Sequence, residues 1–278
     1  MNFSSGLSGC RIYLLDNKIV RKYSSDTTYN SRLLLQIDKQ NFFSNLVFKN
    51  IDTPKILNTK QDELYYFDME YIPGKSFYDY FSVANNSDVK FVLETLFEYF
   101  DALIDNHKTA NVQSNILNKI ISLKNNTNYN SYLSYLENYV SNQKIIIPKT
   151  FCHGDLTFNN IIFHKKRLFF IDFLDSYIDS FLCDLIKLKQ DLFYLWGLTI
   201  ENKKSTRVYQ IYTHIWKKVE NRYYEYINHI NFDIVDGLRG RSSARKDTAH
   251  QCCSARSPRD SDAVESVRSA PASTRPVA

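Results

Sequence analysis

The segment HGDLTFNNIIF at residues 153–163 is followed, after a four-residue turn, by LFFIDF at residues 168–173. Asp155 lies five residues before Asn160, and Asp172 comes twelve residues after Asn160, at the end of an apolar run. Apolar runs on both sides of a short turn predict a β-hairpin. Such a hairpin would hold two acidic side chains and one amide close together on a rigid support.

These three side chains have the chemistry that phosphoryl transfer from ATP requires. One carboxylate orients an acceptor hydroxyl and takes its proton, while an amide oxygen and a second carboxylate hold Mg²⁺ against the phosphates. Magnesium prefers hard oxygen ligands of this kind. An Asp near an Asn is more often a turn or a helix cap. The five-residue spacing and the IDF string that follows favour the catalytic interpretation.

Upstream of this hairpin, the sequence predicts a small sheet with one helix. Strands are predicted at residues 12–15, 19–23 and 63–71, and a helix at residues 32–47. The first two strands flank a turn at residues 16–18, and the third ends before Pro73 and Gly74. Two neighbouring strands joined by so short a turn are expected to pair antiparallel.

The rest of the chain up to residue 235 is predicted to be mainly helical. The predicted helices cover residues 87–106, 112–124, 129–142, 179–196 and 207–230. The first of them can begin with Ser87 or Asp88 as its cap. Its apolar residues repeat at the helical spacing, as Val92, Leu96 and Leu103 show.

The two motifs of the hairpin resemble the catalytic and metal-binding motifs of the aminoglycoside phosphotransferase and choline kinase superfamily, small-molecule relatives of the protein kinases. The similarity covers about residues 4 to 190. It includes a short loop at residues 5–9, a lysine at a strand end, Lys22, and a hinge-like string at residues 69–74. The resemblance implies an α+β fold with two lobes, a small antiparallel sheet in the N-lobe and a mainly helical C-lobe.

The resemblance also implies roles for the matching residues of the hairpin. Asp155 would be the catalytic base or the carboxylate that orients the acceptor, and Asn160 and Asp172 would bind Mg²⁺. We interpret His153 as a structural residue that packs and hydrogen-bonds to the backbone, and Asp184 as a structural hydrogen-bonding residue.

An ATP site is implied by the same resemblance. Its cofactor-binding residues would be Ser5, Gly6, Lys22, Glu70, Tyr71 and Ile72. The first two belong to a nucleotide-binding loop, the lysine would pair with the phosphates, and the backbone of the last three would hold the adenine.

The sequence departs from the family at the partner of Lys22, which is usually a glutamate on the following helix. No Glu occurs in residues 1–62, so Gln36, Asp38 or Gln40 must serve, or the pair is absent. This departure and the sparse glycines of the loop favour an alternative function, a catalytically weak or inactive kinase-like module that binds nucleotide.

Two features favour a small-molecule acceptor over a protein. Position 154 is Gly, where protein kinases carry an Arg, and only residues 173–183 separate Asp172 from Asp184, which leaves little room for a peptide-docking segment. The expected reaction moves the γ-phosphoryl group of ATP to a hydroxyl of an aminoglycoside, of choline or ethanolamine, or of a sugar-like compound. The near-neutral charge of residues 1–235 does not indicate the acidic surface that an aminoglycoside would require.

We predict an N-lobe at residues 1–72, a helical C-lobe with the catalytic hairpin at residues 73–235, and a disordered tail at residues 236–278. The tail has no aromatic residue and carries eight Lys/Arg and five Asp/Glu, which is +3 of the net charge of +5. Such a segment buries too little apolar surface to offset its ordering entropy. Its abrupt change of composition suggests a non-native origin.

Composition excludes several other classes of protein. No run of about 18 apolar residues occurs in the 278 residues, and no basic stretch precedes an apolar core near Met1. We therefore expect no membrane partner and a cytoplasmic location. A net charge of +5 with both signs mixed is far from the dense basic patch of nucleic-acid-binding proteins, so no nucleic-acid partner is expected.

Overall fold

The computed structural model of the chain describes six ranges, which are residues 2–5, 10–15, 18–105, 108–124, 129–201 and 204–229. The chain divides into two compact units, residues 1–235 and residues 236–278. The predicted tail coincides with the second unit and lies outside the described residues, as does most of the predicted nucleotide-binding loop.

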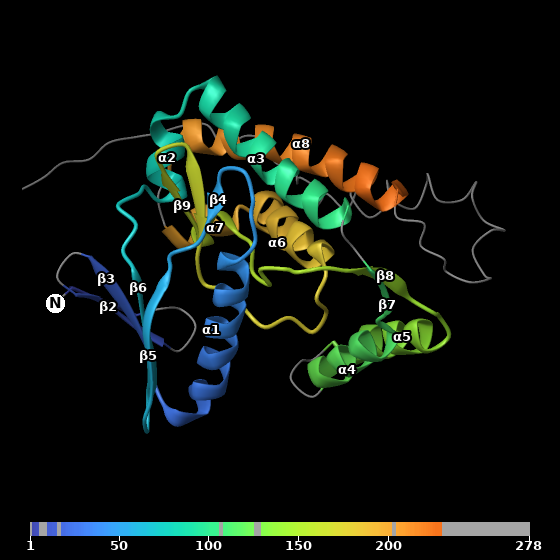
Figure 1. Ribbon diagram of the computed structural model, residues 1–278. Helices are drawn as coiled ribbons and strands as arrows, with labels where there is room; N and C mark the ends of the chain where they lie inside the picture. The colour runs from blue at the N-terminus through green and yellow to red at the C-terminus, as the bar shows by residue number, and fades with distance from the viewer. Residues whose placement is uncertain are drawn as a thin grey trace, which may run out of the picture. The chain divides into compact units, whose positions relative to one another are not determined.

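A five-stranded antiparallel sheet forms the N-terminal part of the first unit (Figure 1). In spatial order its strands are β1 (Asn2–Ser5), β2 (Cys10–Leu15), β3 (Ile19–Ser24), β6 (Tyr65–Glu70) and β5 (Ile56–Gln61). The strands β2, β3 and β6 confirm the predicted hairpin and its third strand. The sequence does not predict β5, because residues 58–61 are all polar and exposed at the edge of the sheet.

One helix, α1 (Asn30–Ser44), packs against the sheet through contacts with β5 and β6. Leu33 and Ile37 of this helix are buried in the apolar cluster that it shares with the sheet. The helix ends three residues before the predicted end, where the N–H of Asn45 closes a tight turn on the carbonyl oxygen of Phe42. A small separate core therefore supports the strand that carries Lys22.

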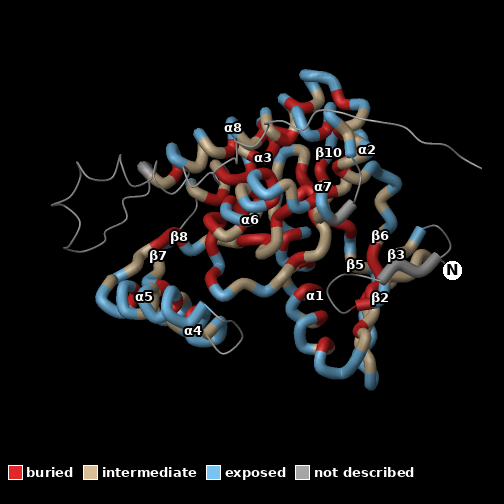
Figure 2. The backbone as a smooth tube through the Cα atoms, turned by 180° about the vertical axis from the view of Figure 1, so that it is seen from behind, coloured by how far each residue is buried: buried red, intermediate tan, exposed pale blue. Residues whose placement is uncertain are grey.

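The C-terminal part of the first unit is mainly helical, as predicted. Its helices are α2 (Phe77–Val83), α3 (Asn86–Asp105), α4 (Gln113–Lys124), α5 (Asn130–Ser141), α6 (Phe181–Tyr194), α7 (Trp196–Glu201) and α8 (Thr206–His229). Helices α3, α6 and α8 pack together around Leu96, Leu188 and Val219, and Figure 2 shows buried positions along all three. The sequence does not predict α2 and α7, which are only seven and six residues long and too short to show a helical repeat.

The ends of two helices differ from the prediction. Asn85, rather than Ser87 or Asp88, caps α3: its Oδ1 accepts from the N–H of Asp88 at 3.1 Å, and Asp88 Oδ2 accepts from the N–H of Asn85 at 3.0 Å. This reciprocal pair is a capping box, in which the third residue of the helix also bonds back to the cap. The helix predicted at residues 179–196 begins at Phe181 and stops where Leu195 takes a left-handed φ of 56°.

Two smaller sheets complete the first unit. One consists of β4 (Ile51–Asp52), β10 (Arg167–Phe170) and β9 (Ile161–His164), and the other of β7 (Lys108–Asn111) and β8 (Ile146–Lys149). β9 and β10 form the predicted hairpin, joined by a turn in which Lys165 and Lys166 both have positive φ. Two single 3-10 turns, η1 (Thr27–Tyr29) and η2 (Phe158–Asn160), precede α1 and β9. In the part of the chain that the structure describes, no helix is both long and apolar enough to cross a membrane.

Candidate active site

Asp155 and Asn160 lie together at the start of the hairpin. The side-chain amide of Asn160 donates to the backbone carbonyl of Asp155 at 2.8 Å and to its Oδ2 at 3.2 Å. The turn η2 makes this contact possible, because the N–H of Asn160 donates to the carbonyl oxygen of Thr157 at 3.0 Å and brings the chain back toward Asp155. The five-residue spacing therefore corresponds to a direct side-chain contact.

Asp172 follows β10 with a φ of 62°, which directs the chain away from the strand. Its Oδ1 accepts a hydrogen bond of 2.8 Å from the Nζ of Lys22, whose side chain is 1% exposed, while that of Asp172 is 32% exposed. The preceding residue is tied to the other strand of the hairpin, because the N–H of Ile171 donates to the carbonyl oxygen of Asn160 at 3.0 Å. The structure thus brings Asp155, Asn160 and Asp172 to one end of the hairpin.

The contact between Lys22 and Asp172 keeps both groups charged. Burial lowers the pKa of Lys22, but the charge and hydrogen bond of Asp172, together with Cys10 and Tyr29, outweigh it and the net pKa is raised. Burial raises the pKa of Asp172, and the charge and hydrogen bond of Lys22 outweigh it, so this pKa is lowered overall. The pair is therefore a lysine ammonium and a carboxylate over the whole neutral range.

The ring of His153 supports the backbone on both sides of the site. It is fully buried, its Nε2 lies 2.8 Å from the carbonyl oxygen of Ile171, and the N–H of Asp155 donates to its Nδ1 at 3.2 Å. Because Nδ1 accepts a hydrogen bond, the ring proton is on Nε2. Burial lowers the pKa of His153 to about 4, so the ring is neutral at neutral pH. Both nitrogens bond to backbone, which fits the structural role expected from the sequence.

Two buried carboxylates on α6 hold the loop that precedes the hairpin. Asp184 accepts from the N–H of His153 at 2.6 Å and from that of Gly154 at 2.8 Å, and Asp191 accepts from the N–H of Phe158 at 2.8 Å. Burial raises the pKa of Asp184 to about 6 and also raises the pKa of Asp191. The geometry agrees with the structural interpretation of Asp184. Asp191 is not predicted from the sequence.

A lysine that the motifs do not indicate lies against Asp155. The Nζ of Lys187 on α6 is 3.0 Å from Asp155 Oδ1, with 43% of the lysine side chain and 28% of the aspartate side chain exposed. Nothing in the residues around position 155 points to this partner, because it belongs to a different element. The one signal in the sequence is helical spacing: Lys187 follows Asp184 by three residues, which puts both on one face of α6.

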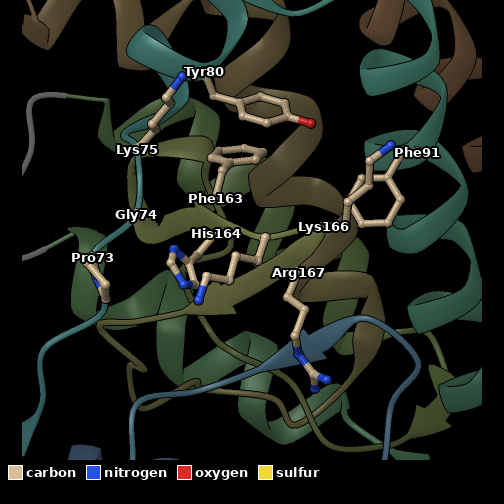
Figure 3. Close-up of a pocket in the computed structure, with 10 residues that line it drawn as sticks. Pro73, Gly74, Lys75, Tyr80, Phe91, Phe163, His164, Lys166 and Arg167 are labelled. Atoms are coloured by element: carbon tan, nitrogen blue, oxygen red, sulfur yellow. The ribbon is translucent and has the colours of Figure 1, made fainter.

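The hairpin is also held on the side of residues 73–75. Lys75 and Phe163 exchange backbone hydrogen bonds of 2.9 and 3.0 Å. The ring of Tyr80 stacks on that of Phe163 with 4.4 Å between centroids, and Figure 3 shows the two rings one above the other. These residues line a pocket of about 220 Å³ together with Lys166, whose ammonium lies over the ring of Phe91. The hairpin is therefore fixed on two sides, as a preorganised site requires.

None of the three candidates on α1 is the partner of Lys22. Gln36 donates to the hydroxyl of Tyr29 at 3.1 Å, and Gln40 donates to the carbonyl oxygen of Pro54 at 2.7 Å. Asp38 is exposed on the outer side of the helix. Within the described ranges, the carboxylate that pairs with Lys22 comes from the hairpin and not from the helix.

The predicted nucleotide-binding residues are only partly described. Ser5 ends β1, where it pairs with Arg11 of β2, and Gly6 lies outside the described residues. Of the predicted hinge, the N–H of Glu70 donates to the carbonyl oxygen of Lys55 at 3.0 Å, and the N–H of Tyr71 donates to that of Lys18 at 2.9 Å. Among the contacts of the described residues, Ile72 is the hinge residue whose N–H has no partner.

The oxygen atoms at the end of the hairpin are of the kind that a magnesium ion binds. Asn160 uses its amide nitrogen to hold Asp155, which leaves its Oδ1 as a possible metal ligand, and Asp172 uses one carboxylate oxygen for Lys22. Hard oxygen ligands from one carboxylate and one amide, with space for phosphate and water, are what Mg²⁺ takes in phosphoryl-transfer sites. The described residues contain no group of three or more His, Cys, Asp or Glu side chains that could hold a metal ion, so these atoms do not resemble a closed protein cage for a transition metal.

Residues 136–219 match a family described as the phosphotransferase enzyme family, APH. The match contains residues 153–163, the hairpin and α6. It confirms the resemblance to the aminoglycoside phosphotransferase and choline kinase superfamily. No curated protein matches the sequence.

The chain is similar in shape to solved structures. APH(2")-IIia, in a complex with GDP and kanamycin, is 14% identical, with 82% of this chain and 89% of that chain covered and a TM-score of 0.50. An ADP-bound aminoglycoside phosphotransferase, APH(2'')-Ib, is 17% identical, with 86% of this chain and 87% of that chain covered and a TM-score of 0.40. The first of these likenesses confirms the kinase-like α+β fold.

Proposed function

We propose that the protein is an ATP- and Mg²⁺-dependent phosphotransferase whose acceptor is a hydroxyl of a small molecule. The observation that carries this proposal is the convergence of three side chains at one end of a clamped hairpin. Asn160 holds the carboxylate of Asp155 at 3.2 Å, and Lys22 holds that of Asp172 at 2.8 Å. This arrangement supplies an acceptor-side carboxylate and a cation-side carboxylate that are fixed independently of each other.

Asp155 would act on the acceptor. The acceptor oxygen forms a bond to the γ-phosphorus while the bond from that phosphorus to the bridging oxygen breaks and ADP leaves. The hydroxyl proton passes to the Asp155 carboxylate, which Asn160 and Lys187 hold in place. Asn160 Oδ1 and Asp172 would hold Mg²⁺, which when bound neutralises charge on the phosphates.

The nucleotide would lie between the sheet and the hairpin. Lys22 is the phosphate-binding group of this proposal, because it is a buried ammonium directed at Asp172. The Ile72 N–H is the hinge donor for the adenine ring, since those of Glu70 and Tyr71 are used inside the protein. Ser5 and Gly6 would approach the phosphates. Residues 1–72 and 73–235 would then be the two lobes of the enzyme, and the cytoplasm its location, because ATP and Mg²⁺ are present there.

A small-molecule acceptor is supported by the short path from Asp172 to α6. Residues 173–180 make backbone contacts with the loop before the hairpin, such as the 2.9 Å bond from the N–H of Leu174 to the carbonyl oxygen of His153. A segment this short and this engaged has no free stretch on which a peptide substrate could dock. The similar APH(2")-IIia structure is a complex with a small molecule, kanamycin.

The test is ADP release from Mg·ATP with a panel of hydroxyl compounds. Asp155→Asn should lower kcat by about 10²- to 10⁴-fold, because it removes the proton acceptor. Asp38→Asn is the matched control, since that aspartate is exposed on α1 and should leave turnover unchanged. Equal turnover by wild type and Asp155→Asn would remove the catalytic assignment.

The absence of a glutamate partner for Lys22 on α1 favours a second candidate, a nucleotide-binding module without activity. This candidate predicts that Mg·ATP binds, as measured by calorimetry, while no compound of the panel is phosphorylated. The same calorimetry with Lys22→Met should abolish binding under both candidates, so only the transfer assay separates them.

A further inference from the structure

One face of α6 lies along the loop that carries the catalytic carboxylate. Asp184, Lys187 and Asp191 follow one another at spacings of three and four residues, which places them on a single face of the helix. The first and last are buried and hold the backbone of the loop, as described above. Lys187 lies between these two fixed points, so its ammonium meets Asp155 from a rigid support.

Both oxygens of the Asp155 carboxylate have a protein partner. Oδ2 accepts from Asn160 at 3.2 Å, and Oδ1 lies 3.0 Å from the ammonium of Lys187. The lysine side chain remains 43% exposed, so its ammonium is open to a bound molecule as well as to Asp155. A hydroxyl that reaches Asp155 must therefore come close to a fixed positive charge.

The other carboxylates near Asp155 do not make the acceptor site strongly acidic. Asp191 is 1% exposed and uses its oxygens for the N–H groups of Phe158 and Gly197. Asp179 lies 3.6 Å from the ammonium of Lys39. Asp175 is the exposed carboxylate of this segment for which the described residues show no ion pair. Lys187 thus neutralises the charge of the catalytic carboxylate, and Asp175 is left as the exposed, unpaired carboxylate that the described residues of this segment show.

We infer that Lys187 is a positioning and specificity-determining residue of the acceptor site, and that the acceptor is a polyol or sugar hydroxyl without a cationic group nearby. The inference rests on the proposed function. Because Lys187 neutralises Asp155, a cationic acceptor group gains no net attraction from that carboxylate, whereas an unpaired carboxylate within about 5 Å would favour its binding by roughly 10- to 100-fold at the effective dielectric constants of protein surfaces. Neutral hydroxyl compounds do not depend on such attraction and can accept a hydrogen bond from the same ammonium.

The experiment compares kcat/KM for neutral acceptors, glucose and myo-inositol, with that for cationic ones, kanamycin and choline, in wild type and Lys187→Glu. Wild type should prefer the neutral class, and the variant should shift the ratio toward the cationic class by at least tenfold. Lys189→Glu is the matched control, because Lys189 lies on another face of α6, over the ring of Tyr223, and should leave the ratio unchanged.

The positioning role of Lys187 is tested separately, by comparing kcat with the KM for ATP. Lys187→Ala should lower kcat by about tenfold while the KM for ATP stays constant, because misplacing a catalytic group affects turnover more than nucleotide binding. Lys187→Arg, which keeps the charge, should recover part of the loss. If Lys187 were purely structural, Lys187→Ala would instead lower the melting temperature. The acceptor ratio would stay unchanged, and Lys187→Arg would recover no turnover.

The outcomes separate the two proposals. A wild type that prefers the cationic acceptors, or an acceptor ratio that Lys187→Glu leaves unchanged, would overturn this inference while the phosphotransferase function stands. Binding of Mg·ATP without transfer to any acceptor would overturn the proposed function, and with it the inference.

Discussion

The ammonium of Lys22 lies 2.8 Å from the carboxylate of Asp172, although 150 positions separate the two residues in the sequence. The contact joins the third strand of the N-terminal sheet to the end of the β9–β10 hairpin. It replaces the bond that a glutamate on α1 would make, and it couples the lysine proposed for the phosphates with the carboxylate proposed for Mg²⁺. The two halves of the proposed nucleotide site are therefore linked by one ion pair.

Replacing the lysine of this pair should weaken both stability and nucleotide use. Lys22→Met leaves the Asp172 carboxylate without its partner. The expected loss is about 2 kcal/mol of unfolding free energy, below the value for a fully enclosed pair, because a third of the Asp172 side chain is exposed. Urea unfolding measures the loss, and kcat/KM for ATP should fall in the same variant.

Lys18→Met is the control for this substitution. Lys18 belongs to the turn before the same strand and is exposed, so its removal should change the unfolding free energy by less than about 0.5 kcal/mol. If the two variants were equally stable, the ion pair would contribute nothing to the fold.

The hairpin proposed to be catalytic could be predicted because its signal is local. The spacing of Asp155, Asn160 and Asp172 and the apolar runs around them fall within eighteen residues, and the same residues meet in the structure. The first strands and the long helices are also local patterns. The edge strand β5 could not be predicted, because its polar residues show neither the alternation of a half-buried strand nor the apolar repeat of a helix.

The residues that the sequence does not reveal act through contacts between distant elements. Lys187 and Asp191 lie on a helix whose apolar period predicts only that it packs, not which loop its polar face meets. The sequence points to Gln36, Asp38 or Gln40 on the next helix as the partner of Lys22, or to the absence of the pair, whereas the structure supplies a partner from the hairpin. Tertiary contacts determine which residues pair in this way, and these contacts cannot be inferred from a single sequence.

Buried His153 should make stability depend on pH. Its pKa is about 4 in the folded protein against an ordinary value of 6.5, so the unfolded chain binds the proton more readily between these values. The contribution of His153 is present above pH 6.5 and is lost as the pH falls toward 4. The difference in unfolding free energy between wild type and His153→Gln should therefore grow by about 3 kcal/mol from pH 4 to pH 7.

The contribution of Asp184 to stability changes with pH in the opposite direction, so Asp184 must be present in both proteins that are compared. Its pKa is raised to about 6, so its burial lowers stability as the pH rises from about 4 to 6. Because both proteins contain Asp184, its contribution cancels in the difference. A difference that does not change with pH would show that His153 titrates normally in the folded state.

Gly154 should not tolerate a side chain. Its φ is 91°, and a Cβ atom at this position would lie 2.3 Å from the carbonyl oxygen of Leu174 and 2.7 Å from the Ser176 hydroxyl. Gly154→Ala should cost at least about 2 kcal/mol of unfolding free energy, since the backbone conformation is strained for alanine and the contact is with backbone. Because the residue precedes Asp155, kcat should fall as well. A variant with the stability and turnover of wild type would contradict the close approach.

The anchor at Asp191 provides the most direct test of how α6 supports the site. Its carboxylate accepts 2.8 Å bonds from the N–H groups of Phe158 and Gly197, and it is 1% exposed, so water cannot replace it. Asp191→Ala leaves two buried donors unpaired and should cost about 2–4 kcal/mol. Asp191→Asn keeps one acceptor oxygen and should cost about half as much. In thermal or urea unfolding, the order wild type, asparagine, alanine is expected, and kcat should fall in the same order because Phe158 begins the turn that carries Asn160. Equal stability of the asparagine and alanine variants would mean that the carboxylate fills space without holding the loop.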